Sequence, residues 1–120
     1  MHLRNVQDAT PAESDHGETV YETVGHVAGG STSHSLAQIV LAPGSASLPH
    51  YHPVAEETYH ILSGEGVVQV DQERVAVQPG DSITIAPGEV HQITNTGQYE
   101  LVFLAICVPA WTPDNSVYVD

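Results

Sequence analysis

The chain has 120 residues and a mass of 12.8 kDa, which predicts one domain with one hydrophobic core. Its 15 acidic residues face only two basic ones, Arg4 and Arg74, so the formal net charge is -13 and there is no lysine. This balance excludes a nucleic-acid-binding protein that depends on phosphate contacts and disfavours binding to an anionic membrane surface. It also excludes an enzyme that forms a Schiff base on lysine.

The compartment is predicted from what the sequence lacks. Cys107 is the single cysteine, so no internal disulfide can form. The longest apolar run, residues 101–110, contains a proline and is too short to span a bilayer. No basic segment followed by an apolar run opens the chain, so we expect a cytoplasmic location. The acidic excess fits either an ordinary acidic protein or one adapted to high salt.

In chain order, three regions are expected. Residues 1–34 form a polar N-terminal arm and an edge strand, with β-branched residues at 20–27 and a Gly/Ser loop at 29–33. Residues 35–110 form an all-β barrel or sandwich, since short strand-like segments alternate with Pro-Gly and Asn-containing turns. The tail, residues 111–120, packs on the barrel or on a partner subunit. Strands are expected at 35–41, 47–52, 57–63, 67–70, 74–77, 82–86, 90–95 and 100–108.

A histidine pair marks the candidate chemistry. His50 and His52 are two residues apart, so on a strand both imidazoles point to the same face. Pro53 breaks that strand, and a turn can bring Glu57 back toward the same point. His91 follows the tight turn at Pro87-Gly88. Three imidazoles and one carboxylate suit Mn, Fe, Co, Ni, Cu or Zn, and a six-coordinate ion would keep about two positions open.

Two motifs in this sequence resemble those of the cupin superfamily. The first reads Gly44, five residues, His50-Tyr51-His52, four residues, Glu57, six residues, Gly64. The second runs from Gly80 to His91, then three residues and Asn95, with the usual proline displaced from Ala86 to Pro87. The spacer between them, residues 65–79, is typical of small microbial cupins. The resemblance implies a double-stranded β-helix, or jelly roll, in which His50, His52, Glu57 and His91 bind one divalent transition metal.

Residues near the ligands have alternative interpretations. Glu56 could replace Glu57 as the ligand, although the spacing to Gly64 favours Glu57. Tyr59 shares a face with Glu57, so it should line the pocket, where its hydroxyl would either orient a substrate or fill space. His60 lies on the opposite face by alternation. It is interpreted either as a packing residue or as a base that reaches the site through a bulge.

Further residues could reach the barrel mouth. Gln69 is a candidate for the mouth, and Asn95 is expected to fix a turn. Cys107 is either near the metal cavity or a buried inert thiol. Trp111 covers a barrel end or packs across a dimer. The histidines outside the motifs are interpreted as surface residues: His2, His16, His26 and His34.

Function follows less directly, because the cupin fold hosts many activities. Small cupins are often described as mannose-6-phosphate isomerase-like, but a phosphorylated substrate needs Arg or Lys, and this chain has two such residues in all. We therefore expect a metal-dependent enzyme, a dioxygenase, isomerase or lyase, with a small oxygen-chelating ligand and with Tyr59 or His60 moving protons. The alternative is a non-catalytic metal or ligand sensor. Exposed sheet edges predict a homodimer.

Overall fold

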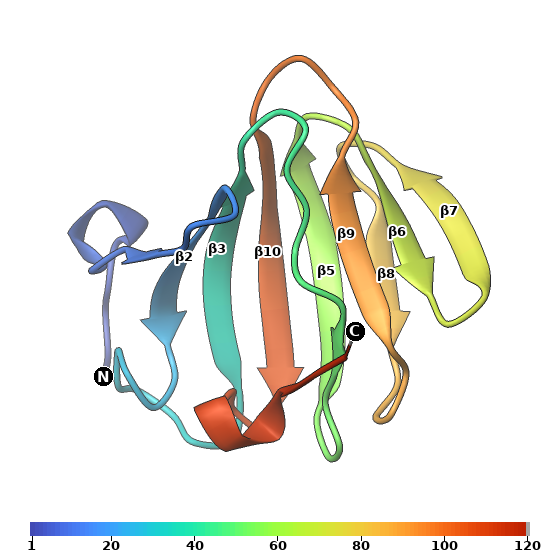
Figure 1. Ribbon diagram of the computed structural model, residues 1–120. Coiled ribbons are helices and arrows are strands. Elements are labelled where there is room, and N and C mark those ends of the chain that lie inside the picture. The colour runs from blue at the N-terminus through green and yellow to red at the C-terminus, as the bar shows by residue number, and fades with distance from the viewer. Residues whose placement is uncertain (120) are drawn as a thin grey trace.

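Antiparallel strands form two sheets in the computed structural model, which describes residues 1–119. The larger sheet has six strands in the order β1-β2-β3-β10-β5-β8. Its central strands lie side by side in Figure 1, with the loop after β3 crossing in front of β5. The bounds are β1 Ala12–Glu13, β2 Glu18–Val24, β3 Ser35–Leu41, β5 Glu56–Ser63, β8 Ser82–Ile85 and β10 Leu101–Val108.

The smaller sheet has five strands in the order β11-β4-β9-β6-β7. Their bounds are β4 His50–Tyr51, β6 Gly66–Val70, β7 Glu73–Val77, β9 His91–Asn95 and β11 Val117–Tyr118. Two short 3-10 helices, Val6–Asp8 and Pro113–Asn115, complete the described elements. Neither helix is long or apolar enough to cross a membrane.

Alternation of buried and more exposed residues, clearest in β5, β9 and β10, builds the core between the sheets. Along β10, Leu101, Phe103 and Ala105 are buried while the residues between them are half-exposed. Each faces a residue of the neighbouring strand, as Phe103 faces Ile39 on β3 and Ile61 on β5. Branched and aromatic side chains suit this half-buried, pleated surface. The all-β prediction is therefore confirmed.

Most strand positions match the sequence-based prediction, and the differences lie at short elements. The strand expected at 47–52 is wrong in extent, since only His50 and Tyr51 pair as β4. Pro49 precedes that pair and Pro53 follows it closely, and proline lacks the amide hydrogen that a central strand needs. Two short strands, Ala12–Glu13 and Val117–Tyr118, were not predicted individually.

Candidate metal centre

Strand register brings His50 and His91 together. His50 on β4 lies directly opposite His91 on β9, and the centroids of their rings are 4.3 Å apart. His52 follows Tyr51, with its ring centroid 4.9 Å from that of His50 and 5.2 Å from that of His91. The three imidazoles therefore gather at one end of the smaller sheet.

Glu57 completes the cluster from the opposite sheet. It lies on β5, beside Cys107 of β10 and Ile85 of β8, and is 5% exposed. One ligand atom from each of the four side chains lies within 4.8 Å of the others. His52 and His91 are also almost fully buried, whereas His50 is half-buried. The structure thus brings together the four residues that the two motifs single out.

Backbone carbonyls set the orientation of all three imidazoles. The Nδ1 atoms of His50, His52 and His91 lie 2.7, 2.7 and 3.0 Å from the carbonyl oxygens of Leu48, Asn115 and Glu89. A carbonyl oxygen only accepts a hydrogen bond, so each Nδ1 carries the hydrogen and donates it. In the neutral ring, Nε2 then has a free lone pair, which is the arrangement that metal-binding histidines use.

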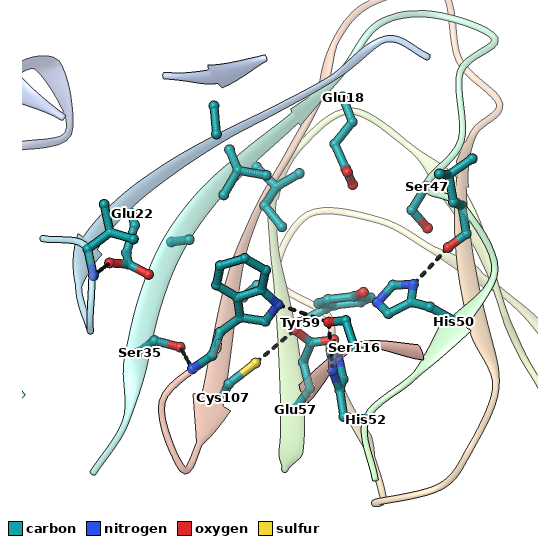
Figure 2. Close-up of a pocket in the computed structure, with 18 of the residues that line it drawn as sticks. Glu18, Glu22, Ser35, Ser47, His50, His52, Glu57, Tyr59, Cys107 and Ser116 are labelled. Atoms are coloured by element: carbon teal, nitrogen blue, oxygen red, sulfur yellow. Dashed lines mark hydrogen bonds and ion pairs between the residues drawn. The ribbon is translucent and has the colours of Figure 1, made fainter. Parts of the chain in front are cut away.

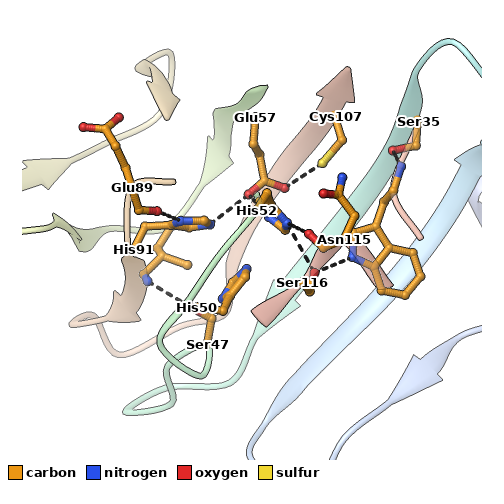
Figure 3. A network of polar contacts seen from close by, with 12 residues as sticks. Ser35, Ser47, His50, His52, Glu57, Glu89, His91, Cys107, Asn115 and Ser116 are labelled. Carbon is orange, nitrogen blue, oxygen red and sulfur yellow. Dashed lines mark hydrogen bonds and ion pairs between the residues drawn. The ribbon is translucent and has the colours of Figure 1, made fainter. Parts of the chain in front are cut away.

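The Nε2 lone pairs meet a carboxylate in the centre. Glu57 Oε1 lies 3.2 Å from His52 Nε2 and 3.1 Å from His91 Nε2, as Figure 3 shows. With both imidazoles neutral, electron-rich atoms would face one another in a buried space. A proton or a metal cation between them removes this repulsion. The donor set of the cluster therefore fits a divalent transition metal.

The pKa values in the metal-free protein reflect the same crowding. Burial, reinforced by His91, lowers the pKa of His50 to about 4. Burial is the largest single influence on Glu57 and His52 and opposes the ionisation of each. The sum of their contacts outweighs it: the contact between the two side chains, with His91 and Cys107 acting on Glu57 and the Asn115 carbonyl acting on His52. The net effect is a lowered pKa for Glu57 and a raised pKa for His52. Glu57 is thus an anion and His50 a neutral ring at pH 7, the states in which both side chains ligate a cation.

Among the residues near Glu57, Tyr59 faces the cluster, whereas Glu56 and His60 face away from it. Tyr59 is buried on the same face, and its ring centroid lies 6.0 Å from that of His91. Glu56 is exposed and lies outside the cluster. His60 faces away from the cluster, and its Nδ1 lies 2.7 Å from Ser82 Oγ on β8. The register shift between β5 and β10 lies beyond His60, between Val102 and Phe103, so it does not turn His60 inward, and the structure does not bring His60 to the site.

Cys107 and Trp111 both line the pocket beside the candidate metal centre. The Cys107 thiol donates a hydrogen bond to Glu57 Oε2 at 3.1 Å. Trp111 is fastened by Ser35 Oγ, which accepts from its backbone amide, and by Ser116 Oγ, which accepts from its indole N–H. Gln69 is placed differently from the prediction: its side chain contacts Asp71 and Arg74 on the outer surface, because Val68 occupies the inward position.

A pocket of about 230 Å³ opens beside the cluster, between the two sheets. Small side chains make room for it. Ala37 and Ala105 pair with each other across β3 and β10, in the row next to that of Ile39 and Phe103. His50, His52, Glu57 and Tyr59 line the pocket on one side, as Figure 2 shows.

The N-terminal arm forms another wall of the pocket, which the sequence did not indicate. His16, Glu18, Val20 and Glu22 line it. His16 was expected to be a surface residue because it lies outside the motifs. The period-two spacing of Glu18, Val20 and Glu22 was the available signal, since such residues share one face of a strand.

Comparison with known proteins agrees with this geometry. A family model described as a cupin domain matches residues 37–107. An uncharacterized protein of Methanocaldococcus jannaschii is 37% identical over 82 residues, which cover 68% of this chain and 66% of that protein. An oxalate-binding protein of Thermotoga maritima is 40% identical over 73 residues, which cover 61% of this chain and 60% of the relative. The chain thus spans just under two thirds of the first relative's length and three fifths of the second's.

A solved structure shares the fold over the full chain. The polyketide cyclase RemF of Streptomyces resistomycificus superposes with a TM-score of 0.82 and 19% identity, covering 100% of this chain and 86% of RemF. At this identity the likeness concerns the fold alone. Together with the family match over residues 37–107, it shows that this chain is a member of the cupin domain family with a double-stranded β-helix fold.

Proposed function

We propose that this cupin is a metal-dependent enzyme that acts on a small, oxygen-chelating metabolite. The observation that carries the proposal is the cluster of three imidazoles and one carboxylate beside a pocket. His50, His52, Glu57 and His91 would hold one divalent transition metal. When bound, such an ion acts as a Lewis acid toward a ligand oxygen or, if redox-active, supports oxygenase chemistry.

Of the chain's own residues, Tyr59 would bind the substrate and donate a proton in a hydrogen bond to it. Tyr59 is buried beside Glu57, and burial together with the Glu57 charge raises the pKa of its hydroxyl well above the ordinary value. The hydroxyl therefore stays protonated at neutral pH and can donate a hydrogen bond to a ligand oxygen. His60 faces the outer surface, so of the two catalytic residues that the sequence suggested, the proposal uses Tyr59.

The charge of the pocket narrows the substrate class. Neither Arg4 nor Arg74 is among the residues that line it. A phosphate or a second carboxylate would therefore lack a cationic partner other than the metal. We infer a neutral organic ligand, such as a diketone or a catechol, in preference to a dianion.

A non-catalytic binding protein is the second candidate. The relative from Thermotoga maritima carries the name oxalate-binding protein and is 40% identical over 73 residues. A protein of this type would keep the metal ligands and bind its ligand without turning it over.

Elemental analysis tests the metal centre first. Protein purified without a His tag or added metal should contain one transition metal ion per chain. His91→Ala should lose the ion, whereas His60→Ala, which removes a histidine from the outer face of the same sheet as Glu57, should retain it. Metal-free wild-type protein that takes up no Mn, Fe(II) or Zn on addition would contradict the proposal.

A substrate panel then separates the enzyme from the binding protein. Fe(II)-, Mn- and Ni-loaded protein would be incubated with diketones, catechols and keto-sugars, and both binding and product would be measured. Product that depends on the metal and falls in Tyr59→Phe supports the enzyme. Tight binding with no product from any probe supports the sensor.

The homodimer and the cytoplasmic location stay predictions from the sequence. Four short strands form the sheet edges, namely β1, β7, β8 and β11, and unpaired edges can add strands from a second copy. We expect a sedimentation mass of twice 12.8 kDa. A single-chain mass at micromolar concentration would contradict the dimer.

A further inference from the structure

Two polar side chains of the N-terminal arm, His16 and Glu18, lie across the pocket from the candidate metal centre. Both line the pocket. Figure 2 shows the Glu18 carboxylate pointing into it from the side opposite Glu57 and His52. Glu18 begins β2, the strand whose alternate residues form this wall. The pocket therefore has a second polar end.

The His16–Glu18 pair has hydrogen-bonding capacity that the protein does not use. His16 Nε2 lies 3.4 Å from Glu18 Oε1, and among the described residues it is buried without a hydrogen-bond partner. Glu22 on the same wall differs, because its carboxylate accepts hydrogen bonds from the amides of Val27 and Ala28 at 2.8 and 2.7 Å. Glu22 thus holds a loop, while Glu18 faces the cavity with His16 beside it.

Local contacts hold the pair in place. Ser14 Oγ accepts a hydrogen bond from the Glu18 amide at 3.0 Å and donates one to the Glu18 carbonyl at 2.8 Å. Between the two polar residues, the Gly17 carbonyl accepts a hydrogen bond from the Ala42 amide. Gly17 has a φ of +86°, and a Cβ there would overlap the side chain of Ser45. The backbone between His16 and Glu18 is therefore held against the barrel by the Ala42 hydrogen bond and by close contact with the Ser45 side chain.

Because the Glu18 carboxylate is largely buried, it has lost hydrogen bonds to water and can accept one from a ligand. Burial raises its pKa above the ordinary value and the charge of Glu57 adds to this, although His16 acts in the opposite direction. A donor on a bound ligand would replace the hydrogen bonds to water that the carboxylate has lost.

The wall between the two polar ends is apolar. Val20, Ala37 and Ile39 lie there, and cationic side chains of Arg or Lys are absent from the pocket lining. A ligand that fills this space needs chelating oxygens at one end, an apolar middle, and a hydrogen-bond donor at the other end. A dicarboxylate such as oxalate has neither the apolar middle nor the donor.

We propose that His16 and Glu18 bind a hydroxyl or ammonium group on the ligand, at the end remote from its metal-chelating oxygens. This inference rests on the proposed function, because it takes the metal centre as the other end of the same ligand. The substrate class is then neutral or cationic molecules with an apolar body. His16 and Glu18 determine the specificity for this class.

A series of catechols with one chelating end and a variable tail tests the pair. Dopamine, hydroxytyrosol, propylcatechol and dihydrocaffeate end a two-carbon tail in ammonium, hydroxyl, methyl and carboxylate groups respectively. Their affinities for Zn-loaded protein would be measured by titration calorimetry. We expect dopamine and hydroxytyrosol to bind about tenfold more tightly than propylcatechol, and dihydrocaffeate to bind most weakly.

Glu18→Gln, which keeps the side-chain shape, should remove most of the advantage of dopamine and reduce the penalty on dihydrocaffeate. Glu13→Gln is the matched control, since it removes the same charge from an exposed position on β1. Equal affinities across the series in wild-type protein, or a dopamine preference that survives Glu18→Gln, would overturn the inference alone. If no catechol binds Zn-loaded wild-type protein, the proposed ligand class fails and the inference fails with it.

Discussion

Cys107 acts on the candidate metal centre through another residue. Its thiol donates to Glu57 Oε2 and is 3% exposed. Burial, with the Glu57 charge, raises the pKa of the thiol, so it remains a protonated donor at neutral pH. This bond occupies Glu57 Oε2, so the other oxygen, Oε1, is the one that points toward the imidazoles. The sequence left open whether this thiol was inert or near the cavity, and the structure places it against a ligand residue.

Removing this donor should weaken metal binding. We expect Cys107→Val, which replaces the thiol with an apolar side chain one carbon larger and loses the donor, to lower the affinity for Zn about tenfold or more. Cys107→Ser, whose hydroxyl also donates, should restore most of it. Competition with a chelator measures both variants. An unchanged affinity in Cys107→Val would mean that the thiol only fills space.

His50 makes the stability of the metal-free protein depend on pH. Its pKa is about 4 in the folded protein and 6.5 in the unfolded chain. Between these values the unfolded chain binds more protons, so the free energy of unfolding should fall as the pH drops from 6.5 toward 4. The contribution of this one group is of order 2–3 kcal/mol.

Urea unfolding in EDTA across that pH range measures the effect. His50→Gln cannot take up the proton, so its stability should change less steeply with pH than that of the wild type. Parallel curves for the two proteins would show that His50 does not carry this dependence.

At the scale of whole elements, the motif glycines are not equivalent. Gly44 and Gly64 both have positive φ values, +78° and +86°. A Cβ at Gly44 would meet nothing within 4 Å, whereas one at Gly64 would lie 2.6 Å from the Glu100 carbonyl oxygen. Gly64 therefore serves two needs, the left-handed backbone after β5 and the close approach of the chain before β10.

Alanine substitution should separate the two glycines. Gly44→Ala adds backbone strain alone, and we expect it to cost about 1 kcal/mol of the free energy of unfolding. Gly64→Ala adds an overlap with backbone that cannot move without shifting β10, so its cost should exceed 3 kcal/mol, roughly the upper range for a single substitution. Urea denaturation compares them, and equal losses would contradict the steric argument.

The long strands could be predicted from the sequence because each carries its own pattern. In β3 and β10, alternation and turn residues mark the strand without knowledge of the partner. The strands of two residues, β1 and β11, have no such pattern and exist only through their neighbours. The extent of β4 likewise depends on its pairing with β9 and β11.

The candidate site likewise has one part that the sequence predicts, the metal ligands, and one part that it does not, the opposite wall of the pocket. His50, His52, Glu57 and His91 follow from two motifs whose spacing reflects turns within a small part of the chain. The opposite wall depends on the register of β2 against β3, where Val20 pairs with Ile39. That register is set by contacts far apart in sequence. The period-two spacing of Glu18, Val20 and Glu22 indicates a shared strand face, but not that this face lines the pocket, and His16 lies before the strand.

The charge of the whole molecule predicts a response to salt. The net charge is -13, and within the described residues every ion pair has a histidine as its basic partner. Arg74 contacts the amide of Gln69, and Arg4 is exposed. Few attractive pairs therefore offset the repulsion among the carboxylates, and folding brings these carboxylates closer together.

Sodium chloride should stabilise the protein by screening this repulsion. The Debye length falls from about 30 Å at 0.01 M to about 3 Å at 1 M. The radius of gyration is 13.4 Å, so at low salt charges interact across the whole molecule and at high salt only between neighbours. We expect Tm to rise steadily with salt, and to rise less in a variant in which exposed Glu65, Glu73 and Glu100 are changed to Gln. A Tm that does not change with salt would show that the acidic surface carries no net repulsion, and would remove the physical basis for interpreting it as an adaptation to high salt.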